Sequence, residues 1–447
     1  MSRLEAKRPS LCKSEPLTSE RVKATLSVLK GVVTSCYGPA GRLKQLHNGR
    51  GGSVCTTSQS AALLASLPVT QPILKILTTS VQNHVSCFSD CGLFTAILCC
   101  NLVENVQGVG LTTTTAIKLN KHLLSLCTEY LKSEICGCRI PIDFGSTQLL
   151  LCLVRSLLTS KPACMLNREE VEHISTLILR AFLLTVPENA KDRIILGKSI
   201  IVPLKGTQPI GSLNSVSPSS YGSVKDWCTA KFGFKHFFHL IPNETTVCSL
   251  LLCNRNDTAW DELKLTCQTA LHALQLTIKE PYVLLGGGCT ETHLAAYIRH
   301  KTRDEPESIL KGDGCTQTEL QLMSEAFCSA LETLAGSLEH DGGEILTDRK
   351  YGHFWSVQAD SPSAVNWPDL LSRCGCGLYS SQEELGWCFL RGAHHPFMPQ
   401  TCLPREASGS ANDLTLDCFT AKLSGLQVAV ETANLILDLS YVIEDRN

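Results

Sequence analysis

Apolar residues at helical spacing dominate both ends of this 447-residue chain and restrict the folds open to it. From Ser19, the segment "SERVKATLSVLKGVVTSCYG" places Val22, Leu26, Leu29 and Val33 on one stripe. This predicts a helix with Ser19 as its N-cap, which stops at the "YGPAG" turn. Further apolar segments follow with short breaks at 61–67, 73–81 and 93–106. The amino-terminal part is therefore predicted to be a compact helical region.

The pattern then changes twice along the chain. Two amphipathic helices are predicted between about 141 and 184, the second opened by Asn167 with acidic residues in its first turn. Next come the strand-like "RIILGKSIIVPLKG", a Gly/Pro/Ser-rich stretch at 207–223, and the short β-type runs "KHFFHLI" and "VCSLLLC". From Asp257 helical spacing resumes up to Leu338, an irregular stretch covers 351–410, and a long helix closes the chain. A chain of this length is expected to form two or more domains.

The charge balance excludes some classes of partner. The chain has 40 basic and 42 acidic residues, a formal net charge of -2, which does not favour nucleic acid or an acidic membrane surface. The first residues alternate in charge and lack the apolar core of a secretory signal. No later segment offers roughly 18 uncharged apolar residues in a row. We expect a soluble intracellular protein with no nucleic-acid partner and no membrane insertion.

Cysteine is unusually frequent, with 24 residues. In an intracellular protein these are expected to be reduced thiols, and most lie in apolar runs where they act as small buried hydrophobes. Two "CGC" pairs, Cys136–Cys138 and Cys374–Cys376, have the form of metal half-sites, but structural zinc prefers two to four residues between paired ligands. The buried-thiol interpretation is favoured. "EHDGG" at Glu339–Gly343 lacks a second histidine for a metal site and is predicted to be a helix-ending loop.

Four separated stretches match one protein family. "YGPAGRLKQL" (Tyr37–Leu46) resembles the leucine-glycine-proline-lysine-glycine phosphate loop of group II, TCP-1-type chaperonins, and "FSDCGLFTAIL" (Phe88–Leu98) falls where that family carries "GDGTT". "LLGGGCTETHLA" (Leu284–Ala295) is similar to the "PGGGAxE" turn, and Leu416–Leu437 is similar to the closing helix "DPLxVKxxAlxxAxEAAxxIL". The chain is identified as a divergent, cysteine-rich member of this family. The resemblance covers nearly the whole chain.

The resemblance implies a mainly α fold in three parts. The helical equatorial domain would comprise 1–140 and 284–447, and a small α/β intermediate domain would comprise 141–205 and 253–283. A family member would carry an apical domain between the intermediate segments, on the order of 100 residues or more. Here only 206–252 remains, as in a shortened form of the kind that alternative splicing produces. This apical remnant is predicted to be irregular, disordered or badly packed.

The resemblance also implies a nucleotide site for ATP and Mg²⁺. Its backbone donors and carboxylates would come from Gly38, Pro39, Gly41, Asp90, Gly286, Gly287, Gly288 and Asp417. Within this set, Asp90 matches the magnesium-binding aspartate and Asp417 the aspartate that contacts the nucleoside. Taken from the residues alone, Asp90 is equally explained as the N-cap of the next helix, and Gly286–Gly288 as a simple turn. Arg42 and Lys44 are more often solvated charges than phosphate ligands.

Several positions depart from the family pattern. Ser89 replaces a glycine, and Gly92 and Leu93 replace the threonines that touch phosphate. Ser58 and Thr269 stand where the family has its second and third aspartates, the latter thought to activate water. Neutral hydroxyls cannot serve as anionic metal ligands or as a base near neutral pH. No catalytic residue is assigned, and we expect weak or vestigial ATP/Mg binding with weak or absent hydrolysis.

The function implied by the resemblance is that of a chaperonin-like chaperone which assists protein folding and the assembly of ciliary, BBSome-type complexes. Its partners would be TCP-1-type subunits and sibling chaperonin-like subunits, with BBSome proteins as clients. The location implied is the cytosol and the centrosome or basal body. Two alternatives stay open from the sequence. One is an active ATP-hydrolysing subunit that uses Asp90, and the other is a non-functional truncated splice form.

Overall fold

The computed structural model describes most of the chain at residue level. The described residues are 11–47, 54–67, 69–186, 198–205, 212–214, 224–232, 235–242, 247–254, 256–310, 314–338, 344–348, 354–357, 385–389, 401–402 and 414–444. Glu339–Gly343 and the Cys374–Cys376 pair lie outside them.

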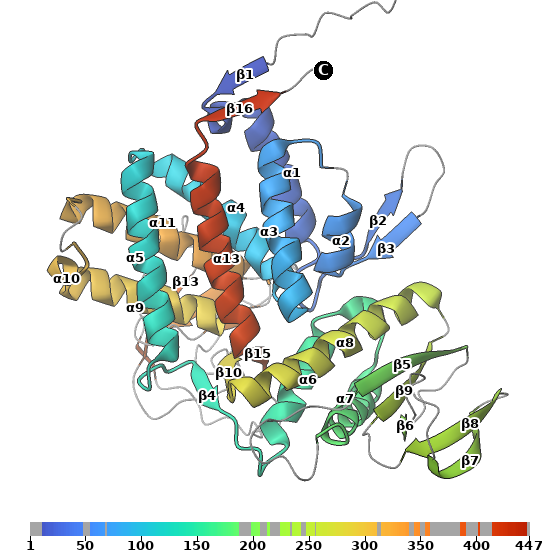
Figure 1. Ribbon diagram of the computed structural model, residues 1–447. Helices are drawn as coiled ribbons and strands as arrows, with labels where there is room; N and C mark the ends of the chain where they lie inside the picture. The colour runs from blue at the N-terminus through green and yellow to red at the C-terminus, as the bar shows by residue number, and fades with distance from the viewer. Residues whose placement is uncertain are drawn as a thin grey trace, which may run out of the picture.

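A helical body forms from the two ends of the chain (Figure 1). Its helices are α1 (Glu20–Thr34), α2 (Ser60–Ser66), α3 (Pro72–Phe88), α4 (Gly92–Val109), α5 (Thr113–Lys132), α9 (Cys289–Asp304), α10 (Pro306–Leu310), α11 (Gln317–Gly336) and α13 (Phe419–Leu437). The predicted stripe of α1 is buried, with Ser19 at the N-cap position. Helix α5 was not singled out from the sequence.

Helix α4 lies at the centre of this body. It packs against α1, α3, α11 and α13, so it is apolar on all sides. By length and composition alone it could cross a membrane, with a mean hydropathy of 1.3 over 18 residues, but 72% of that window is buried inside the protein. We therefore interpret α4 as a core helix.

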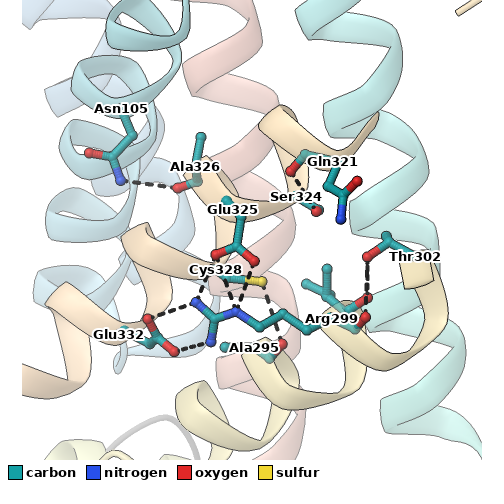
Figure 2. Close-up of polar contacts among 11 residues, drawn as sticks. Asn105, Ala295, Arg299, Thr302, Gln321, Ser324, Glu325, Ala326, Cys328 and Glu332 are labelled. Atoms are coloured by element: carbon teal, nitrogen blue, oxygen red, sulfur yellow. Dashed lines mark hydrogen bonds and ion pairs between the residues drawn. The ribbon is translucent and has the colours of Figure 1, made fainter. Parts of the chain in front are cut away.

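Helices α9 and α11 are joined by a charged cluster on their contact face (Figure 2). The Arg299 guanidinium of α9 lies between Glu325 and Glu332 of α11, and forms hydrogen bonds with both carboxylates. The Asn105 side chain of α4 donates to the Ala326 carbonyl at 3.0 Å. These contacts fix the register of α11 against both neighbours.

Short sheets tie distant segments together. Strand β1 (Leu11–Ser14) pairs antiparallel with β16 (Tyr441–Glu444), and β2 (Lys44–His47) with β3 (Val54–Thr57). A three-stranded sheet has the order β15 (Leu416–Cys418), β10 (Tyr282–Leu285), β4 (Arg139–Pro141), all antiparallel neighbours. The three-stranded sheet brings three segments that are far apart in the chain to one place.

A mixed α/β region lies below the helical body in Figure 1. It contains α6 (Gln148–Thr159), α7 (Arg168–Leu183), α8 (Asp257–Lys279) and a sheet of β5 (Lys198–Lys205), β9 (Val247–Asn254) and β6 (Ser212–Asn214). Strands β5 and β9 are parallel. The Asn167 side chain accepts from the Glu170 amide, and Glu170 bonds back to the Asn167 amide, which forms the capping box that opens α7.

The prediction that 206–252 is irregular is wrong for its described part. Besides β6 and β9, this stretch contains the antiparallel hairpin of β7 (Val224–Phe232) and β8 (Lys235–Pro242). Leu250, Leu251 and Leu252 are buried because β9 packs against α7 and α8. The helices of the mixed region supply the apolar partners that the sequence argument assumed to be missing.

The stretch 351–410, also predicted to be irregular, needs a smaller correction. Its described residues form β12 (Phe354–Val357), β13 (Leu385–Phe389) and β14 (Thr401–Cys402), in a sheet of order β12-β11-β13-β14 with β11 (Glu344–Asp348). The mainly α fold class is confirmed. The domain boundaries remain predictions.

The burial of β9 gives a direct test. Leu250→Ala is expected to lower the free energy of unfolding by about 2–5 kcal/mol, because it leaves a cavity between β9 and the helices. Trp227→Ala, on the exposed β7–β8 hairpin, should change it by less than about 0.5 kcal/mol. Urea denaturation of both variants measures the difference. If both substitutions changed the free energy of unfolding by equally small amounts, the prediction that 206–252 is irregular would be supported instead.

Candidate functional site

One cavity of about 410 Å³ lies where the four family-like stretches meet. Of the residues predicted from the sequence, those that line it are Gly38, Pro39, Asp90, Gly287, Gly288 and Asp417. Gly41 and Gly286 do not. The Gly41 amide donates to the Gly38 carbonyl and the Gly286 amide to the Thr415 carbonyl, so each shapes a turn at the edge of the cavity. A Cβ at position 41 would lie only 2.4 Å from the Cys36 carbonyl oxygen.

Two helices begin at this cavity. Gly92, Leu93 and Phe94, in the first turn of α4, line it, and α9 begins after Gly287 and Gly288. The first backbone N–H groups of a helix have no partner within the helix and carry partial positive charge. Two such ends at one cavity make a suitable site for phosphate groups.

The loop before α4 keeps a glycine-like backbone without its glycines. Ser89 and Cys91 stand at the glycine positions of the family signature and have φ angles of 60° and 59°. Residues with a side chain occupy this left-handed region at a cost of roughly 1–2 kcal/mol each. The loop is held there by hydrogen bonds from Thr269 to the Ser89 carbonyl (3.1 Å) and between His272 and the Ser89 hydroxyl (2.8 Å).

The space beside Gly92, where the family signature has a threonine, is occupied by neighbouring side chains. A Cβ at Gly92 would lie 2.4 Å from both the Ser60 hydroxyl and a Val85 methyl carbon. A threonine cannot be accommodated at this position without movement of its neighbours. The replacement noted from the sequence therefore has a packing cause.

Asp90 lies in the cavity wall and does not cap the helix. The N-cap position of α4 is Cys91, so the N-cap interpretation of Asp90 is wrong. Burial raises the pKa of the Asp90 carboxyl, and the Cys91 amide, which donates to it, opposes that rise. The cavity thus holds a carboxylate that is poorly solvated, the condition under which binding of a cation is most favourable.

Lys161 and Glu262 were missed in the sequence analysis. Lys161 follows α6, lines the cavity and donates to the Ser58 carbonyl at 3.2 Å. Burial lowers its pKa, and the charges of Glu262 and Asp90 oppose that change. Lys161 is a cation placed to meet an anion in the cavity. A lysine just after an amphipathic helix gives no sequence signal of this role.

Glu262 is a buried carboxylate beside the cavity. It accepts hydrogen bonds from the Thr57 hydroxyl (2.5 Å), the Ser58 hydroxyl (2.6 Å) and the Ser58 amide (3.1 Å). Ser58 itself does not line the cavity. The one signal in the sequence is a glutamate next to Leu263 on the apolar face of α8.

Asp417 forms an ion pair with another lysine of the cavity, the buried Lys422. Lys422 of α13 lies 2.9 Å from the Asp417 carboxylate and 2.5 Å from Glu291 of α9, with its ammonium 4.3 Å from the centre of the Phe94 ring. Burial alone would lower the pKa of Lys422, but the two carboxylates raise it well above its usual value. Lys422 is therefore a permanent cation in this wall.

The donor set fits phosphate and magnesium better than it fits hydrolysis. Asp90 and Asp417 are the only carboxylates among the described lining residues, and Asp417 is already paired. The Thr269 hydroxyl donates to a carbonyl and cannot take a proton from water. No group of three or more His, Cys, Asp or Glu side chains gathers among the described residues, so a Mg²⁺ ion would share its coordination with phosphate oxygens and water.

Comparison with known proteins identifies the family. The family model for the TCP-1/cpn60 chaperonin family matches residues 29–209 and 199–447. The chain belongs to the TCP-1/cpn60 chaperonin family. Its two matched segments meet at 199–209, where β5 ends.

Full-length relatives come from mammals. The chaperonin chain is 64% identical to "Molecular chaperone MKKS" of Homo sapiens and 59% identical to that of Mus musculus, each over 570 aligned positions that cover all of both chains. Since the chain has 447 residues, at least 123 aligned positions (570 − 447) have no residue in it. It is also 35% identical to "Thermosome subunit alpha" of Saccharolobus shibatae, over 21% of this chain and 15% of that one.

The two carboxylates of the cavity should respond oppositely to neutralisation. Asp90→Asn is expected to raise the melting temperature at neutral pH, because the raised pKa shows that the charged form is penalised in the folded state. The penalty is full above the folded pKa and vanishes below the unfolded pKa, so the gain should shrink as pH falls. Asp417→Asn should lower the melting temperature, since it removes a partner of Lys422. Melting curves across pH measure both, and a lower melting temperature for Asp90→Asn would contradict the assignment.

Proposed function

We propose that this protein is a chaperonin-like molecular chaperone that assists protein folding and assembly, and that its cavity binds ATP with magnesium but hydrolyses it weakly or not at all. The observation that carries the proposal is the cavity itself. Four family segments and two helix N-termini enclose it, while its only unpaired carboxylate among the described lining residues is Asp90. The names of two relatives, "Molecular chaperone MKKS" and "Thermosome subunit alpha", support the same class.

Different residues of the cavity would bind the phosphates, the magnesium ion and the nucleoside of ATP. The amides at the start of α4 and of α9, with Lys161, would hold the phosphates. Asp90 would contribute a carboxylate oxygen to Mg²⁺, which when bound neutralises phosphate charge. Asp417, fixed by Lys422, would face the nucleoside. Because Ser58 and Thr269 supply only hydroxyls that already donate to neighbours, neither of them would act as a base toward water.

Magnesium-ATP is therefore expected to raise the melting temperature of the full chain, with ATP alone raising it less. Asp90→Asn should lose the dependence on magnesium, whereas Asp261→Asn, at an exposed position of α8, should keep it. Phosphate release should not exceed that of the Asp90→Asn variant. A hydrolysis rate well above that variant would favour the alternative of an active ATPase.

We also propose that the chain lacks most of an apical domain. The relatives align over more positions than the chain has residues, and the family match divides at 199–209. The equatorial parts would be 1–140 and 284–447, and the intermediate parts 141–205 and 253–283. The buried face of β9 does not favour the alternative of a non-functional truncated form, since the remnant packs onto α7 and α8.

The helical body supports proposed partners. In the family this domain carries contacts between subunits, so we propose TCP-1-type and sibling chaperonin-like subunits as partners, and ciliary BBSome proteins as clients. The cytosol and the centrosome or basal body are the corresponding locations.

Affinity purification of the tagged full chain is expected to recover TCP-1-type subunits, detected by mass spectrometry. Leu250→Ala provides a matched control, because β9 packs against α7 and α8 of the mixed region and the variant is expected to keep the helical body folded. Recovery should therefore be similar for both chains. Absence of TCP-1-type subunits from the wild-type sample, at equal expression and with a protease-resistant core, would contradict the proposed partnership.

A further inference from the structure

The cysteines of the first "CGC" pair form a close dithiol just after the C-terminal end of α5. The sulfur atoms of Cys136 and Cys138 lie 3.4 Å apart, in the segment between α5 and β4. Both side chains are buried, while Gly137 between them is exposed. A disulfide requires the two sulfurs to approach to about 2.05 Å, a small movement from this starting point.

The two thiols are chemically unequal. A hydrogen bond from Cys138 lowers the pKa of Cys136 to about 7, and the amides of Cys138 and Arg139 add to this, against the effect of burial. The same hydrogen bond and burial raise the pKa of Cys138. Near neutral pH the Cys136 sulfur is therefore partly in the thiolate form, and the Cys138 sulfur beside it stays a thiol.

The geometry points to a redox modification site in which Cys136 and Cys138 form a reversible intramolecular disulfide when the chain meets a peroxide. The Cys136 thiolate attacks one peroxide oxygen and becomes a sulfenic acid, and the leaving hydroxide takes a proton to form water. The Cys138 sulfur then attacks the sulfenic sulfur and expels the second water. The dithiol loses two electrons, the peroxide gains two, and an external dithiol reverses the change.

Another pair of cysteines shows why sequence proximity is not sufficient. Cys99 and Cys100 are adjacent in α4, but both are buried in the helical core. Burial raises the pKa of both, to about 12 for Cys100. Neither is a thiolate at neutral pH, so neither begins the reaction.

The glycine between the reactive cysteines suits the site. A Cβ at position 137 would lie 2.8 Å from Nε2 of His293, so a larger residue there would have to displace the end of the His293 side chain. The backbone here also leads to the cavity. The Leu285 amide donates to the Cys138 carbonyl at 2.9 Å, and Leu285 immediately precedes Gly286–Gly288. Closure of the disulfide would move a carbonyl that holds the strand leading into that turn.

Trypsin provides a clean assay on the full chain. Cleavage after Lys132 and Arg139 releases the peptide Ser133–Arg139, which contains these two cysteines and no others. After treatment with dilute hydrogen peroxide and then iodoacetamide, we expect this peptide to lose both alkylation adducts and to be lighter by two hydrogen atoms than its reduced form. Dithiothreitol should restore both adducts. Exposed Cys87 serves as an internal reference for general oxidation.

Two variants identify the separate roles. Cys138→Ser should stop at the Cys136 sulfenic acid, which dimedone traps, and Cys136→Ser should give no dimedone adduct in this peptide. Melting curves test whether both variants fold. If one variant does not fold, the alkylation of the wild-type peptide is the measurement that tests the proposal. The proposal is overturned if both thiols stay alkylatable at a peroxide dose that oxidises Cys87. It is equally overturned if wild-type Cys136 pairs with another cysteine or proceeds to sulfinic acid.

Discussion

The buried ammonium of Lys422 is the interaction on which the cavity depends. It joins α13 to α9 through Glu291, pairs with Asp417 in the middle of β15, and lies over the Phe94 ring at the start of α4. Phe94 and Lys422 are more than 300 residues apart in the chain. Without the lysine, the buried Glu291 carboxylate would lose its counter-charge and the partly exposed Asp417 its partner. Removal of one partner from a buried ion pair typically costs about 3–5 kcal/mol. The fold and the site therefore share one electrostatic centre.

The loop before α4 has the backbone conformation expected of glycine, although its residues are not glycines. Ser89 and Cys91 hold left-handed φ angles at two positions where the family has glycine. Such a conformation persists only where the surroundings determine it. Here the surroundings are Thr269 and His272 of α8, which hold Ser89, and His84 of α3, which bonds to the Asp90 carbonyl. The loop shape is thus a property of the packed helices rather than of its own residues.

The sequence predicted those features that follow from periodicity and from ordered motifs. The stripe of α1, the start of α7 at Asn167 and the helical spacing of α8 from Asp257 each depend on neighbours a few residues apart, and each is present. The convergence of Gly38, Asp90, Gly288 and Asp417 followed from motif order. Packing of β9 could not be predicted, because it depends on helices before and after it in the chain. Lys161 and Glu262 were missed for the same reason, since their roles come from contacts more than 100 residues away.

Ser58 and Thr269, which stand where the family resemblance places aspartates, both act as hydrogen-bond donors. The Ser58 hydroxyl donates to Glu262 of α8, and the Thr269 hydroxyl of α8 donates to the Ser89 carbonyl. Both bonds connect the helical body to the helix that crosses the mixed region. An aspartate at either position would be an acceptor only, and would face Glu262 or a carbonyl oxygen at unfavourable distance. An aspartate at either position alone would therefore break one of the contacts that join the helical body to α8.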